Sequence, residues 1–289
     1  MRAEGFESRW SARWAGGWAL TRVAFGLAAI DAQLARWRDV RAALAIPELV
    51  FASGPTRLSD HVLLGPVASW ILWGVAFLPL VGVILGRSWA RAGVLGWFVL
   101  HASLLAALGL NVRAPERFVF LLVVALLFSP IDEPALHRKW RSPAPRWLLI
   151  LLYSSLYGST GWLKLTVDPA WWTGDALRYD LVERFHAGGV LATWLSGHPA
   201  LCLVMSWFTL GFEALFPILI GWPAATPWLL LAGVGMHLGI GTLMHVGPLG
   251  TMAMAAYPAL CDPDRAEALW KRAVGLLDRV RGLRGGTLG

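Results

Sequence analysis

Long stretches almost free of charge recur along the chain, and they constrain its fold more than any other feature. The stretches are 13 to 23 residues long, and a bilayer core about 30 Å thick needs roughly 20 residues of helix at about 1.5 Å each. Only 15% of the 289 residues are charged and 57% are hydrophobic, against about 25% charged in an ordinary soluble domain. The sequence therefore predicts an all-α fold, a polytopic transmembrane helix bundle in lipid.

Eight spans are predicted, and together they form one membrane domain, residues 1–261. They cover 18–35, 67–85, 92–110, 118–130, 147–165, 200–222, 228–244 and 247–261. The fourth and eighth are short for a crossing, so whether they cross fully or re-enter stays open. Residues 262–289 are predicted to form a cytoplasmic, amphipathic helix at the membrane surface, capped by Asp262 with Pro263 at its first position.

Basic residues gather on one side of the predicted topology. With the N-terminus inside, the inner segments carry 15 Lys and Arg and the outer segments carry 8. Because basic loops stay cytoplasmic, both termini are predicted in the cytoplasm of a multi-pass protein of a cytoplasmic membrane. Contact with anionic headgroups also accounts for the net charge of +7. The bilayer is therefore the expected partner, and nucleic-acid binding is not predicted.

Four polar side chains are predicted to lie near the middle of the membrane. Glu213 and His237 each lie nine residues from the 223–227 turn end of their spans, which places them about 14 Å deep. The turn makes their spans an antiparallel hairpin, so the two side chains lie at one level where they could pair. His101 and Tyr157 reach a similar depth. Polar residues at this depth need a partner or a function. Counting residues along each helix does not show whether these side chains only hold the helices together or form a site.

Lys164 is the other notable charge within a span, about 26 Å from the inner end at helical rise. From the sequence alone, an amine that snorkels to the outer headgroups is the favoured interpretation. If it faced the interior instead, loss of water would favour the neutral amine, which can act as a base. Asp31 and His245 lie toward the same end and could line an outward-facing cavity with Lys164.

Motifs of soluble enzymes are absent from the sequence. It contains no phosphate-binding glycine loop, no HExxH, no CxxC and no GxSxG. Cys202 and Cys261 fall within apolar segments, where packing is their expected role. Neither a disulfide nor a metal site is predicted.

The fifth predicted span and the segment after it read LYSSLYGSTGWLKLTVDPAWWTGDAL (152–177). This segment resembles the HTTM family, the membrane domain related to vitamin K-dependent gamma-carboxylase. The family's tyrosine, glycine, lysine, tryptophan and glycine correspond here to Tyr157, Gly161, Lys164, Trp172 and Gly174. Residues 110–130 resemble its asparagine-bearing loop and next span, and residues 208–244 resemble its glutamate span followed by a histidine span. The resemblance covers most of residues 15–261.

The resemblance implies a chemistry as well as a fold. It implies that Lys164 is the base that deprotonates a quinol such as vitamin K hydroquinone. The oxygenated quinone species then removes a proton from a glutamate, and the carbanion adds carbon dioxide. Glu213 and His237 are then the orienting or proton-relay groups of the catalytic set. The expected cofactor-binding residues are His101, Tyr157 and His245.

Two departures from the carboxylase bear on the substrate. The carboxylase carries a second lysine beside the base, where this chain has Leu163, and a large lumenal region, where about 28 residues follow the last predicted span. The expected substrate is therefore a lipid, a quinone or a small peptide, and the enzyme a carboxylase-like lyase or oxidoreductase. One alternative is a non-catalytic partner for maturation, export or immunity of a secreted peptide, as in the small bacterial SdpB-like members. Another is a small-solute transporter, whose inverted repeats are not evident.

Overall fold

The computed structural model describes residues 13–38, 40–41, 66–86, 88–107, 114–132, 140–183, 189–268, 271–272 and 275. Across these ranges the chain is helical apart from turns and one short strand pair. In that pair, β1 (Arg13–Trp14) runs antiparallel to β2 (Trp140–Arg141). The predicted all-helical fold is confirmed.

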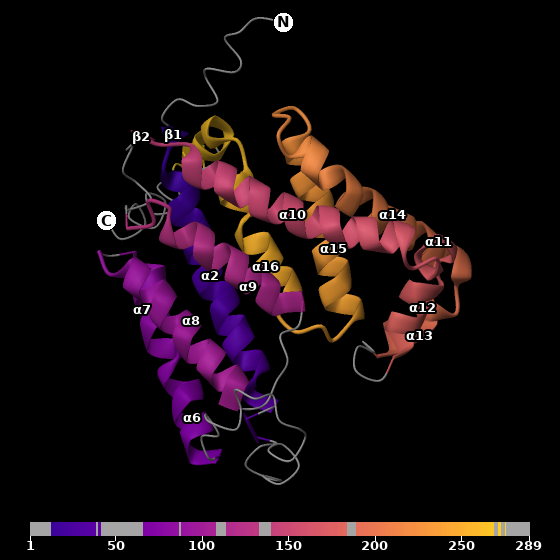
Figure 1. The fold of residues 1–289 in the computed structure, drawn as a ribbon, viewed down its shortest axis with the longest axis horizontal. Helices are drawn as coiled ribbons and strands as arrows, with labels where there is room; N and C mark the ends of the chain where they lie inside the picture. Colours follow the sequence, from indigo (N-terminus) through magenta and orange to yellow (C-terminus); the bar gives the residue numbers. More distant parts are fainter. Residues whose placement is uncertain are drawn as a thin grey trace, which may run out of the picture.

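Every predicted span contains at least one helix, and three short helices follow the fifth (Figure 1). The helices are α2 (Gly16–Ala35), α6 (Pro66–Val75), α7 (Phe77–Leu85), α8 (Ala90–Ala107), α9 (Ala114–Leu127), α10 (Ala144–Thr166), α11 (Ala170–Thr173), α12 (Asp175–Val182), α13 (Val190–Ser196), α14 (Pro199–Leu219), α15 (Thr226–Leu243), α16 (Leu249–Ala255) and α17 (Tyr257–Leu260). The second predicted span is divided between α6 and α7, and the eighth between α16 and α17. Helices α11, α12 and α13 lie between the fifth and sixth predicted spans, a stretch for which no span was predicted.

Within the residues that the structure describes, three segments are long and apolar enough to cross a membrane. They are Val67–Leu85, Pro199–Leu219 and Thr226–Leu243, and only 28%, 33% and 33% of each is buried within the protein. Most of their apolar side chains therefore face outward, where lipid is a far better solvent than water. The chain is a membrane protein. Helical segments Ala90–Ala106 and Leu249–Leu260 are also apolar but shorter.

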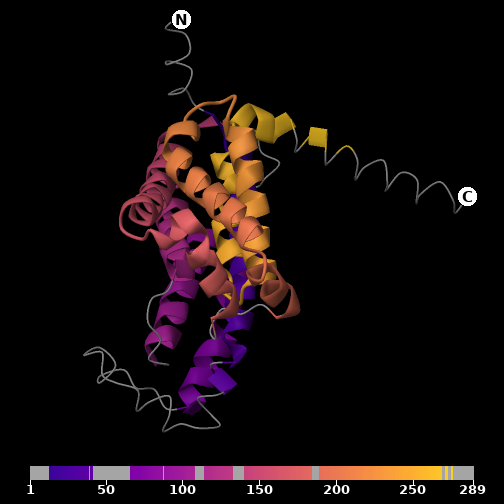
Figure 2. The ribbon, with the colours of Figure 1, turned by 90° about the vertical axis from the view of Figure 1, so that its right-hand side faces the viewer.

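In Figure 1 the long helices α10 and α14 run across the direction of α2 and α15, and the bundle is narrower in the side view of Figure 2. Helix α2 packs against α7, α16 and α17, while α10 packs mainly against α14 and α9. The starts of α2 and α10 meet the end of α17, where Arg146 donates a hydrogen bond to the carbonyl oxygen of Leu260 at 3.0 Å. At the other end, Arg36 after α2 forms an ion pair with Glu116 in the first turn of α9.

The start of the tail is described, and its predicted cap is confirmed. The backbone N–H groups of Asp264 and Arg265 donate to Oδ1 of Asp262, at 3.1 and 3.3 Å. A helix follows from residue 263 to residue 268. Most of the predicted amphipathic tail beyond it lies outside the described residues.

Candidate functional site

The amine of Lys164 is turned into the bundle. Lys164 lies in the last turn of α10, and its Nζ donates to Oε1 of Glu213 on α14 at 2.6 Å, with side chains 23% and 9% exposed. The same Nζ lies 4.2 Å from the ring centroid of Trp171 on α11. The snorkelling orientation favoured from the sequence is therefore wrong, because a buried carboxylate and an indole face hold the amine inside.

Small residues on α10 let α14 come close at this ion pair. A Cβ on Gly161 would lie 3.0 Å from both the amide nitrogen of Ala214 and the Cβ of Glu213. A Cβ on Gly158 would lie 3.1 Å from Cγ of Pro217. Pro217 has no N–H, so the carbonyl group of Glu213 lacks its usual helical donor. Glycines at the contact therefore allow the close approach that brings Lys164 within reach of Glu213.

A second polar pair lies two helical turns deeper along α10. The hydroxyl of Tyr157 is 2.7 Å from Nε2 of His237 on α15, and both residues are only 3% exposed. Phe212 and Phe216 of α14 pack on the Tyr157 ring, with ring centroids at 5.2 and 4.5 Å. The hydroxyl and the imidazole thus form a proton donor and acceptor enclosed by aromatic rings.

Glu213 and His237 were predicted to lie at one level where they could pair, and the structure pairs them otherwise. Within the described part of the chain, neither Oε2 of Glu213 nor Nδ1 of His237 has a hydrogen-bond partner. No hydrogen bond therefore joins the two side chains. They are connected through α10 instead, because Lys164 and Tyr157 are two turns apart on one helical face.

A different buried polar cluster contains His101, and sequence reasoning missed most of it. Nδ1 of His101 is 3.3 Å from Oε1 of Gln33, and the imidazole stacks on Trp97 with centroids 4.8 Å apart. Arg36 and Glu116, with side chains 9% and 8% exposed, form their ion pair at the same end of α2. Gln33 and Arg36 are three residues apart, a spacing that places both on one helical face. That spacing was the signal available in the sequence.

Asp31 contacts α16, and His245 lies at the protein surface. Oδ2 of Asp31 accepts a hydrogen bond from the hydroxyl of Thr251 on α16 at 2.7 Å. His245 is exposed just beyond the end of α15. The structure thus joins Lys164 to Glu213 and Tyr157 to His237, while His101 belongs to the separate cluster around Gln33.

The tryptophan and glycine after α10 have local structural roles. Nε1 of Trp172 donates to the carbonyl oxygen of Leu165 at 2.9 Å, which satisfies one of the free carbonyl groups at the end of α10. Gly174 has φ of 79°, and a Cβ there would lie 2.7 Å from the amide nitrogen of Leu203. The Trp172 ring also packs on Trp207 of α14, with centroids 4.7 Å apart, so both residues help to place α11 and Trp171 beside the amine of Lys164.

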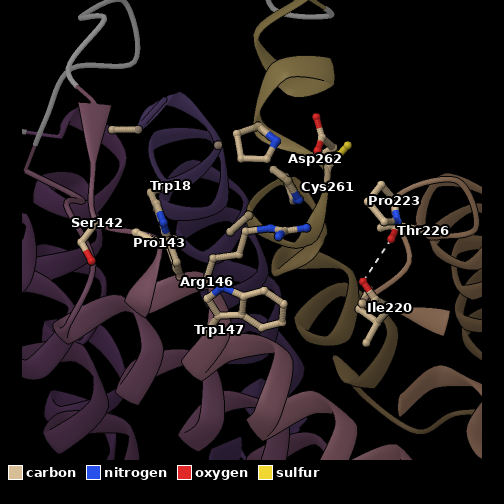
Figure 3. Close-up of a pocket in the computed structure, with 16 residues that line it drawn as sticks. Trp18, Ser142, Pro143, Arg146, Trp147, Ile220, Pro223, Thr226, Cys261 and Asp262 are labelled. Carbon is tan, nitrogen blue, oxygen red and sulfur yellow. Dashed lines mark hydrogen bonds between the residues drawn. The ribbon is translucent and has the colours of Figure 1, made fainter. Parts of the chain in front are cut away.

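Three described cavities lie elsewhere in the bundle, and Lys164 lines none of these three. The cavity in Figure 3 lies where α2 and α10 begin, and the side chain of Arg146 extends across it toward Cys261. Its volume of about 60 Å³ leaves room for roughly two water molecules. A second cavity, of about 380 Å³, lies beside Arg91 and Asp132. The third, of about 400 Å³, is an open groove between α9 and α10.

Comparison with protein-family models, curated proteins and solved structures finds no match to this chain. The likeness to the HTTM family stays an expectation drawn from the sequence segments quoted above.

Proposed function

We propose that this chain is a multi-pass protein of a bacterial cytoplasmic membrane in which Lys164 acts as a base near the extracytoplasmic side. Two observations support the topology with both termini in the cytoplasm. The starts of α2 and α10 meet the end of α17 at one end of the bundle. The segments assigned to that cytoplasmic side carry 15 basic residues against 8 on the other.

The inward ion pair between Lys164 and Glu213 carries the proposal. Their contact of 2.6 Å provides a direct path for the ammonium proton to move to the carboxylate. The transfer leaves a neutral amine and a neutral carboxylic acid, a state that apolar surroundings favour because burying two charges is costly. The neutral amine can then accept a proton from an acidic hydroxyl group placed beside Trp171. Tyr157 and His237 act as positioning residues that tie α10 to α15 below the amine.

A quinol fits the donor set at this site. The Lys164 side chain is 23% exposed, and the Trp171 ring beside its amine offers a flat surface for an aromatic ring. When bound, such a quinol supplies a weakly acidic hydroxyl and reducing electrons. Lys164 would hold that hydroxyl and Trp171 would orient the ring. The activity would then be a carboxylase-like lyase or oxidoreductase reaction, as the resemblance to the HTTM family implies, and its substrate a lipid or a small peptide.

Oxygen uptake tests this proposal with the full-length protein in lipid nanodiscs and a reduced naphthoquinone as the probe. We expect uptake above that of empty nanodiscs, and we expect both Lys164→Met and Lys164→Arg to abolish the increase. Arginine keeps the charge but does not become a neutral base. Lys271→Met is the matched control, since this exposed lysine pairs with Glu267 near the tail, and it should keep full uptake. Equal uptake by the wild type and Lys164→Met would refute the proposal.

One observation favours a second candidate, a non-catalytic partner for maturation, export or immunity of a secreted peptide. The amine of Lys164 is engaged by Glu213 and Trp171 together, and it joins α10 to α14 and α11. A purely structural tie predicts no quinol-dependent uptake by the wild type. It also predicts that Lys164→Arg retains the fold and the peptide-related phenotype, because arginine can form the same pair.

A further inference from the structure

We propose that the groove between α9 and α10 binds an anionic phospholipid. The phosphate would lie at Arg117, and one acyl chain would follow the apolar part of the groove. The groove has a volume of about 400 Å³, and its lining includes Arg117, Phe120, Leu121, Leu152, Ser155 and Leu156. Lys164 does not line it, so this inference goes beyond the proposed function and stands independently of it.

The charge at the mouth of the groove is positive. Glu116, the acidic residue of the described lining, is 7% exposed and its carboxylate is bound to Arg36. The neighbouring Arg117 is exposed and keeps its charge at the surface. A headgroup with a single negative charge therefore complements this mouth, whereas the amine of a zwitterionic headgroup would meet a cation.

The position of Arg117 within α9 points to the same ligand. Helix α9 begins at Ala114, so Arg117 stands in its first turn. A cation in the first turn faces the positive end of the helix dipole, which destabilises the helix. Helix stability therefore gives no reason for an arginine at this position. A bound phosphate would be attracted both to Arg117 and to the positive end of the helix dipole, and it would face the backbone N–H groups of the first turn.

The walls of the groove suit an acyl chain. Phe120 and Leu121 line one side, and Leu152 and Leu156 line the other. The hydroxyl of Ser159 donates to the carbonyl oxygen of Leu156 at 3.0 Å, so its hydrogen does not point into the groove. The wall from Leu152 to Ser159 is two helical turns, or about 10 Å, long. It would contact the part of the acyl chain that lies nearest the headgroup.

The test measures lipid retained by the full-length protein. The protein is reconstituted with equal amounts of phosphatidylglycerol and phosphatidylethanolamine that carry the same acyl chains, and bound lipid is counted by native mass spectrometry. We expect retention to favour phosphatidylglycerol. Arg117→Gln should lower that preference about fivefold, the factor for one arginine near an anionic surface. Arg38→Gln, at an exposed arginine outside the groove, should leave it unchanged.

A second variant keeps the test decisive if Arg117→Gln does not fold. Ser155→Trp fills the groove from an exposed position and should lower phosphatidylglycerol retention, whereas Leu151→Trp, at an exposed position outside the lining, should not. Equal retention of both lipids by the wild type would overturn the proposal. So would equal effects of each variant and its control. Displacement of the lipid by excess inorganic phosphate would identify a site for free anions and would also overturn it.

Discussion

The contact between α10 and α14 at Gly161 predicts a measurable loss of stability in Gly161→Ala. The new Cβ would lie 3.0 Å from the amide nitrogen of Ala214, 3.0 Å from Cβ of Glu213 and 3.1 Å from the Glu213 carbonyl carbon. These atoms belong to or adjoin the backbone of α14, so the helix itself must move by a few tenths of an ångström. Overpacking costs about 1 to 3 kcal/mol, and the better helix propensity of alanine offsets about 1 kcal/mol. We expect a net loss of up to about 2 kcal/mol, and a loss of about 1 to 3 kcal/mol relative to a glycine-to-alanine change that meets no neighbouring atom.

Steric trapping in lipid nanodiscs gives the free energy of unfolding that this prediction needs. Gly211→Ala is the matched control, because it lies on α14 and a Cβ there would meet nothing within 4 Å. It should be as stable as the wild type or slightly more stable, since only the propensity gain remains. If Gly161→Ala and Gly211→Ala have the same stability, α10 and α14 do not approach as described.

Two further predictions use the same measurement on other buried polar contacts. Arg36→Met removes the ion-pair partner of the buried Glu116 and should lower the free energy of unfolding by about 3 to 5 kcal/mol. The double variant with Glu116→Leu should recover most of that loss. A double variant no more stable than Arg36→Met would contradict the ion pair. Tyr157→Phe removes the hydroxyl from Nε2 of His237 and should cost about 1 to 3 kcal/mol. Tyr179→Phe, at an exposed ring, should change stability by less than about 0.5 kcal/mol, and an equal loss in both tyrosine variants would argue against the bond.

The long helices were predictable because apolar runs determine them. The fifth span was predicted over 147–165, and α10 covers Ala144–Thr166. The break between α6 and α7 was not predicted, although its cause is visible in the sequence. Pro79 has no N–H for the carbonyl group of Val75, four residues earlier, and α6 ends at Val75. Proline therefore divides an apolar run that hydropathy alone presents as one helix.

The polar residues of the candidate site could be found from the sequence, but their partners could not. Helical rise placed Glu213 and His237 at one level, but counting along each helix says nothing about which way a side chain faces. Glu213 therefore meets Lys164, and His237 meets Tyr157. The seven-residue spacing of Lys164 and Tyr157 already placed those two side chains on one face of α10.

The short helices after α10 were missed because hydropathy carries no signal for them. Their boundaries coincide with residues that favour helix ends in any sequence. Pro169 precedes α11, Gly174 with its positive φ separates α11 from α12, and Pro199 begins α14. Turn chemistry rather than apolar periodicity thus determines where Trp171 lies over the amine of Lys164.

A double-mutant cycle tests most directly whether the amine of the fifth predicted span is held inside the bundle. Unfolding free energies are measured in nanodiscs for the wild type, Lys164→Met, Glu213→Gln and the double variant. If Nζ is bonded to the carboxylate at 2.6 Å, the two substitutions should be coupled by more than about 1 kcal/mol. Additivity within about 0.5 kcal/mol would contradict the inward ion pair and the proton transfer proposed from it.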